Sequence, residues 1–146
     1  MRLLALLLAT AALSAACGSD GGASGGTGAD AEAAWLDLVQ SMDLVPAPGF
    51  VEIVVSAGSG RLDLVLTLSA EAPAEAFFAD GLYGATAYTY AGEAWRRVDT
   101  ADVRTQVAPI LRAGEEARLT LPVEPAESYR VLVPVEGKAS WADSGR

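Results

Sequence analysis

The sequence predicts an all-β fold, an antiparallel β-sandwich of about seven strands that is preceded by a short helix and a flexible linker. Residues 61–69 alternate in hydrophobicity, and their apolar side carries Leu62, Leu64, Leu66 and Leu68. This period of two is typical of a strand with one buried face. Other strand-like segments follow at turn-sized intervals over about a hundred residues, which favours a sandwich. Only residues 31–146 have a core-forming pattern, and that length suits one domain.

Residues 1–16 have the three parts of a secretory signal peptide. Arg2 provides a positive start, residues 3–13 are Leu and Ala apart from one Thr, and small residues stand before Cys17. The apolar run is too short for a permanent membrane span, which needs about 20 residues. We therefore expect this leader to be removed.

The stretch Leu13-Ser14-Ala15-Ala16-Cys17 resembles the lipobox of bacterial lipoproteins, although Ser14 stands where that pattern prefers Leu. The resemblance implies that Cys17 receives a lipid and becomes the new amino terminus, so that the lipid bilayer is a partner of the chain. The small residues before Cys17 also suit the ordinary signal peptidase. Because Gly18 rather than Asp follows Cys17, the expected location is the outer membrane, or the outer face of the cell membrane where there is only one.

Residues 17–30 are predicted to comprise the lipidated Cys17 and a flexible tether. The segment is rich in Gly and Ser, and such chains behave as random coils, so it would hold the domain about 20 Å from the membrane. Cys17 is the only cysteine of the chain, so no internal disulfide can form and the domain depends on its core.

A short amphipathic helix is predicted over residues 31–46. Its apolar positions follow the helical spacing i, i+3, i+4 and i+7, at Trp35, Leu38, Val39 and Met42. Asp30 is placed to cap its start, and Pro46 prevents continuation. We expect the helix to pack Trp35 over one edge of the domain; docking of a partner is the alternative.

The sandwich is predicted over residues 50–146. Its expected strands are 50–55, 61–69, 83–90, 94–98, 118–123, 128–135 and 139–143, with a hairpin turn at 91–93. Residues 72–80 suit a loop or one helical turn, and residues 103–107 alternate weakly. Pro122 and Pro134 lack a backbone donor and so belong at sheet edges or strand ends.

These residues also resemble known modules. Gly92-Glu93-Ala94-Trp95-Arg96-Arg97-Val98, Leu111-Arg112-Ala113-Gly114-Glu115 and Tyr129-Arg130-Val131 look like bacterial immunoglobulin-like domains of lipoproteins. The end of the chain, through Gly137-Lys138-Ala139-Ser140-Trp141, is similar to the last hairpin of fibronectin type III modules. The resemblance covers about residues 50–143 and implies an immunoglobulin-like sandwich. It also implies that Tyr129 is the tyrosine-corner residue, whose hydroxyl bonds nearby backbone, and it brings no catalytic residue.

Charge and composition argue against several functions. The net charge of −9 disfavours nucleic acid, which is bound through clustered Lys and Arg. The chain contains no His, the usual general base and the commonest metal ligand. Lys138 and Ser140 could form a nucleophile pair on one strand face. The residues beside Lys138 are instead typical of a solvated turn, which argues against such a pair. We expect no enzymatic activity and no cofactor.

Two groups of residues are candidate binding sites. Tyr88 and Tyr90 share one strand face with Trp95 across the hairpin, so they form either an exposed aromatic platform for a protein or glycan, or part of the core. Three acidic side chains, Glu93, Asp99 and Asp102, are candidates for a weak calcium site.

The sequence therefore predicts a non-enzymatic, membrane-anchored module that binds another envelope protein or contributes to the envelope surface. The alternative is a binding protein for a small ligand or cation, which would use the acidic loops and the aromatic residues. A hydrolase that uses Ser or carboxylates is a third, more remote reading.

Overall fold

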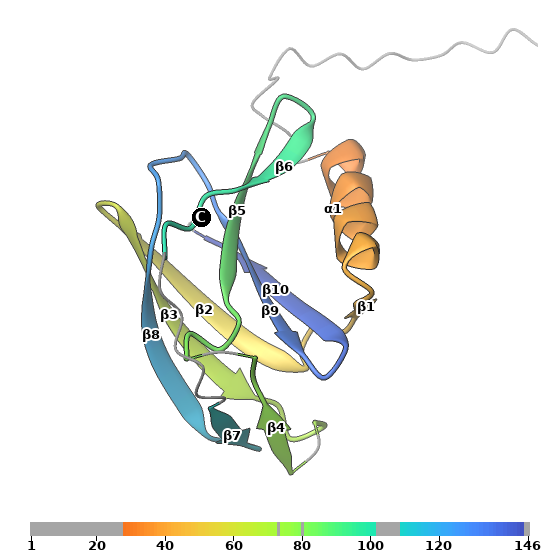
Figure 1. The fold of residues 1–146 in the computed structure, drawn as a ribbon, viewed down its shortest axis with the longest axis vertical. Helices are drawn as coiled ribbons and strands as arrows, with labels where there is room; N and C mark the ends of the chain where they lie inside the picture. Colours follow the sequence, from red (N-terminus) through yellow and green to blue (C-terminus); the bar gives the residue numbers. More distant parts are fainter. Residues whose placement is uncertain (1–27, 73, 80, 102–108, 145–146) are drawn as a thin grey trace, which may run out of the picture.

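A computed structural model describes residues 28–72, 74–79, 81–101 and 109–144 (Figure 1). Within these ranges the chain forms one helix, α1, and strands β1–β10 in three sheets. The prediction of a mainly β domain with one short helix before it is confirmed. Residues 1–27, including the predicted leader, Cys17 and most of the tether, lie outside the described residues, as do residues 103–107 of the weakly alternating segment.

Helix α1 spans Ala29–Ser41, so it ends earlier than the predicted residue 46. Its amino-terminal cap is Gly28, which makes no side-chain cap bond, and Asp30 lies in the first turn instead of at the cap. There the Asp30 carboxylate still favours the helix, because the amino-terminal end of a helix carries a partial positive charge. The helix ends because Asp43 takes a left-handed conformation, with φ +58°.

The five-stranded sheet has the order β1-β10-β9-β5-β6. It is antiparallel except that β1 runs parallel to β10. Its strands are β1 (Val45–Pro46), β5 (Thr86–Ala91), β6 (Ala94–Arg97), β9 (Arg130–Val135) and β10 (Lys138–Asp143). The predicted hairpin is confirmed, since β5 and β6 pair on either side of Gly92, which has φ +60°. Pro134 lies beyond the last residue of β9 that pairs with β5, where a missing donor is tolerated.

The three-stranded sheet has the order β2-β3-β8 and is antiparallel throughout. Its strands are β2 (Val51–Gly58), β3 (Arg61–Leu68) and β8 (Glu116–Pro122). A separate two-stranded sheet pairs β4 (Glu75–Phe77) with β7 (Ile110–Arg112). The sequence did not predict this small sheet, because three-residue strands are too short to show a period of two.

The five-stranded and three-stranded sheets meet where the chain leaves β6. Asp99 forms a β-bridge with Val123, and the amide of Thr100 donates to the carbonyl of Pro122. The chain thus passes from the edge of one sheet to the edge of the other, and the fold includes a curled half-barrel (Figure 1).

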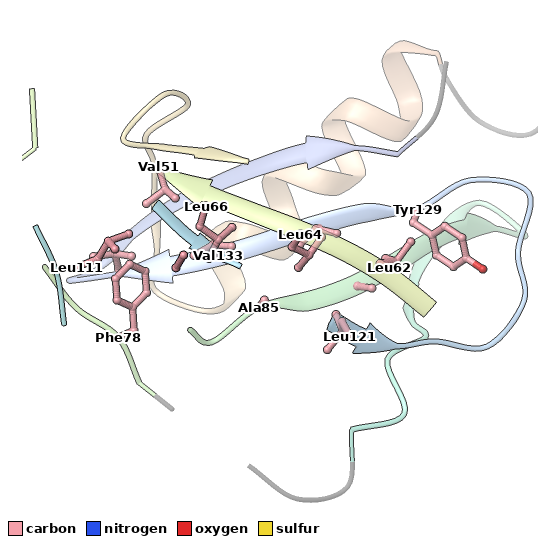
Figure 2. Packing of buried hydrophobic residues seen from close by; sticks show 14 of the residues in the cluster. Val51, Leu62, Leu64, Leu66, Phe78, Ala85, Leu111, Leu121, Tyr129 and Val133 are labelled. Atoms are coloured by element: carbon pink, nitrogen blue, oxygen red, sulfur yellow. The ribbon is translucent and has the colours of Figure 1, made fainter. Parts of the chain in front are cut away.

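The main core lies inside this curl. The four leucines of β3 predicted to share one face, Leu62, Leu64, Leu66 and Leu68, are all buried. Figure 2 shows Leu64 and Leu66 close to Val133 of β9, with Phe78 and Leu111 at one end of the core. The prediction that the apolar side of the alternating segment is buried is therefore confirmed.

Tyr129 fixes the corner between β8 and β9. Its hydroxyl donates to the carbonyl of Glu124 at 2.9 Å and accepts from the amide of Ala126 at 2.9 Å. Its ring is buried in the main core. The expectation that this hydroxyl bonds nearby backbone is confirmed.

Candidate functional site

A second buried cluster lies on the outer face of the five-stranded sheet, beneath α1. Its buried members are Trp35, Val39, Tyr88, Leu132 and Ala139, and Trp95 and Trp141 pack against them. The cluster is separate from the main core, which contains no residue of α1. The helix therefore covers an apolar sheet face that would otherwise be exposed (Figure 1).

Trp35 is the centre of this cluster and is completely buried. Its ring centroid lies 5.5 Å from that of Tyr88, 4.9 Å from that of Trp95 and 5.8 Å from that of Trp141. All three contacts have the edge-to-face geometry that aromatic pairs favour. All three tryptophans of the chain thus meet at one place.

Arg130 completes the cluster from the first position of β9. Its guanidinium lies 5.1 Å from the ring centroid of Trp35 and 4.7 Å from that of Trp95. It forms ion pairs of 2.6 Å with Asp143 of β10 and with Glu32 of α1. The Arg130 side chain is only 8% exposed, which strengthens its contacts with the two rings, whereas the Glu32 and Asp143 side chains are 53% and 55% exposed, so solvent screens the two ion pairs in part.

The charge state of Arg130 follows from two opposing effects. Burial acts to lower the pKa of the guanidinium, but its hydrogen bonds to Asp143 and Glu32 outweigh burial and raise the pKa above the ordinary value. Arg130 is therefore a permanent cation that links α1 to the sheet.

One hydrogen bond also joins the helix to the hairpin. The indole nitrogen of Trp95 donates to the carbonyl of Ala31 at 2.8 Å. Two other donors in the cluster, Nε1 of Trp35 and Nη1 of Arg130, are buried without a hydrogen-bond partner. Such donors lower the net gain from docking the helix, because each has lost its water.

The structure brings the three predicted aromatic binding residues together. Tyr88 and Tyr90 share the outer face of β5, and Tyr90 pairs with Trp95 across the hairpin, their ring centroids 5.3 Å apart. The face is neither an open platform nor part of the main core, because α1 covers Tyr88, which is 8% exposed. Tyr90 and Trp95 keep partial exposure at the edge of the helix. A binding role for the three residues stays a prediction.

The three candidate calcium ligands are placed differently. Glu93 lies in the β5–β6 turn with φ +67°, and Asp99 follows β6. The Asp99 carboxylate accepts from Nε of Arg97 at 2.6 and 2.9 Å. Asp102 lies outside the described residues. In the part of the chain that the structure describes, no group of three or more His, Cys, Asp or Glu side chains could hold a metal ion.

Lys138 and Ser140 do share a strand, but their side chains have structural contacts. The Ser140 hydroxyl donates to the carbonyl of Ala47 at 2.9 Å and accepts from the amide of Val51 at 3.0 Å. The ammonium group of Lys138 lies 4.7 Å from the ring centroid of Phe50. Ser140 thus fixes the segment that leads from β1 into β2.

Sequence reasoning did not identify Arg130 and Glu32 as members of a site. One signal was present: Val131, Leu132 and Val133 are three consecutive apolar residues in a strand. A run of this kind indicates burial on both faces. Leu132 lies two residues after Arg130 and therefore on the same outer face of β9. The run thus indicated that another element covers that face.

No family model, curated protein or solved structure matches this chain. Over the residues that the structure describes, no helix has the length and apolar character to cross a membrane.

Proposed function

We propose that this chain is a membrane-anchored, non-enzymatic lipoprotein whose immunoglobulin-like module contacts another protein of the cell envelope or contributes to the envelope surface. The observation that carries the proposal is the order of features at the amino terminus: a positive start, an apolar run, small residues, and the single Cys17 followed by a glycine-rich tether. Two lipid chains or more give stable anchoring, and the tether would let the domain reach partners near the membrane.

The strand order supports the immunoglobulin-like part of the proposal. In that fold, strands A, B and E share one sheet, and strands C, F and G share the other. Strands β2, β3 and β8 correspond to the first set, and β5, β9 and β10 to the second. The hydroxyl bonds of Tyr129, just before β9, correspond to the tyrosine corner of that fold. The small β4–β7 sheet and the helix on the outer face are departures from it.

Two of the polar candidates support a non-enzymatic role. The Ser140 hydroxyl is engaged by two backbone groups, and the Asp99 carboxylate is engaged by Arg97. A nucleophile or general base needs lone pairs or protons that can reach a substrate. These two side chains instead hold segments of the fold together.

An exposed apolar pair on the small sheet supports a protein contact. Phe77 of β4 and Ile110 of β7 are directly opposite each other and are 55% and 49% exposed. A partner that covers both would bury cross-strand apolar surface, which favours association.

The anchor is tested by the fate of Cys17. We expect mass spectrometry of the mature chain to show an acylated amino-terminal Cys17, and we expect Cys17→Ser to move the protein from the membrane fraction to the soluble fraction. Ser19→Ala, in the tether, is the matched control and should leave fractionation unchanged. An unmodified thiol, or a Cys17→Ser chain that stays in the membrane, would refute the anchor.

The contact role is tested separately by crosslinking in the native envelope and purification of the mature protein. We expect recovery of an envelope protein that is lost in the double variant Phe77→Ser, Ile110→Ser and retained in Val54→Ser, a control that changes another exposed apolar side chain. If no partner is recovered and a small ligand or Ca²⁺ raises the melting temperature, the alternative of a ligand-binding protein is correct instead.

A further inference from the structure

Helix α1 is a separable unit of the fold. Its apolar contacts belong to the second cluster, whereas the main core contains no residue of α1. Its polar links to the sheet include the Glu32–Arg130 ion pair and the bond from Trp95 to the Ala31 carbonyl. The helix can therefore leave the sheet without opening the main core, as in other local unfolding units.

The connection between α1 and the sheet is short and conformationally strained. The amide of Leu44 donates to the carbonyl of Val39, and the amide of Asp43 donates to the carbonyl of Gln40. This is a Schellman motif, whose left-handed position is usually Gly but here is Asp43, with φ +58°. An L-residue in this conformation is disfavoured relative to the extended one.

The chain is fixed again immediately after this turn. The amide of Val45 donates to the carbonyl of Gly137 at 2.9 Å, and that of Ala47 donates to the carbonyl of Ala139 at 2.8 Å. Residues 42–44 are thus the hinge between two firmly held elements. When extended, they span about 10 Å, which would carry α1 away from its own sheet.

We propose that the outer face of the five-stranded sheet accepts α1 from a second copy of this chain, and that opening of residues 42–44 gives a dimer in which the helices are exchanged. The occupant is a second copy because the face complements this helix in detail. Trp35 fits between Tyr88, Trp95 and Trp141, and Glu32 reaches Arg130.

Exchange retains these contacts, because each joins α1 to the sheet, whereas Met42 and Leu44 of the hinge, which also pack against the cluster, must move when the hinge opens. It also relieves the left-handed conformation of Asp43 in both copies. Short, strained hinge loops favour such exchange over the closed monomer. Lipid anchoring is not required for the proposal.

The hinge provides the first test. The full chain with Cys17→Ser, which can form neither a lipid anchor nor an intermolecular disulfide, is analysed by sedimentation equilibrium. Asp43→Gly removes the strain of the left-handed position and so favours the closed turn over the open hinge by about fivefold. Two turns open in each dimer, so the dimerisation constant should fall by about twenty-five-fold. Asp43→Val should strengthen dimerisation, because a β-branched residue is least compatible with positive φ. Monomer alone at millimolar concentration in both the parent chain and Asp43→Val would overturn the proposal.

Complementation distinguishes exchange of helices from simple side-by-side association. Trp35→Ala removes the side chain that α1 contributes to the contact and leaves the sheet face unchanged. Trp95→Ala removes a side chain of the sheet face and leaves α1 unchanged. Mixing the two variants restores one complete helix–face pair only if α1 crosses between copies. With equal amounts of the two variants, we expect native mass spectrometry to show heterodimer well above the half of all dimers that random pairing would give. A statistical mixture of dimers, or no heterodimer, would overturn the exchange.

Discussion

Trp35→Ala should detach α1 while the β domain stays folded. Trp35 is the only member of the second cluster that contacts Tyr88, Trp95 and Trp141 through its ring, so its removal leaves a hole at the centre of the contact. The main core is a separate cluster and loses none of its packing.

The magnitude follows from burial and from one unpaired donor. Truncating a completely buried Trp costs about 3–5 kcal/mol. Its Nε1 is buried without a partner, and removing that donor recovers about 1–2 kcal/mol. The expected net loss is about 1–4 kcal/mol of the free energy that docks α1. The loss in global stability cannot exceed the docking free energy, because the helix can detach alone.

Hydrogen exchange measured by mass spectrometry resolves the two units. In Trp35→Ala, amides of residues 29–41 should exchange much faster, whereas those of β3 and β9 should keep most of their protection. Leu36→Ala is the control on the same helix, because Leu36 is 44% exposed and its loss should cost about 0.5 kcal/mol or less. The reasoning is refuted if α1 keeps its protection, or if β3 loses protection as much as α1 does.

Two further substitutions test individual contacts by denaturant unfolding. Tyr129→Phe removes the hydroxyl that joins two backbone groups at the β8–β9 corner and should destabilise the domain by about 1–2 kcal/mol. The control Tyr90→Phe should have a smaller effect. Equal losses of stability in the two variants would contradict a special role for the corner. Arg130→Met keeps much of the side chain's length but removes both ion pairs and the cation–π contacts. It should weaken α1 docking by about 1–3 kcal/mol. An unchanged rate of hydrogen exchange at the α1 amides would show that the charge contributes nothing to docking.

Much of the β domain was predictable because the relevant signals are local. The alternation of β3 identified its buried leucines, and the Gly92 turn identified the β5–β6 hairpin. The spacing of Trp35 and Val39 placed them on one face of a helix. Each of these signals depends on the geometry of one element or one turn, which a few consecutive residues determine.

The aromatic residues of β5 show what a local pattern cannot predict, namely which element covers a strand face. Alternation correctly placed Tyr88 and Tyr90 on one face of β5, but it left two readings, an open platform and a core face. The structure has a third arrangement, in which α1 covers an outer sheet face. The Arg130 side chain is buried for the same reason, because α1 covers the face of β9 on which it lies.

By itself the sequence determined that the chain has a mainly β domain after one short helix, and which side chains lie together on each element. Only the tertiary structure decided the order of the strands, the pairing of β4 with β7, and the docking of α1 over Tyr88 and Arg130. The physical reason is that periodicity is set by backbone geometry within one element. What covers a face is set by complementary packing between segments far apart in the chain, as between Glu32 and Arg130.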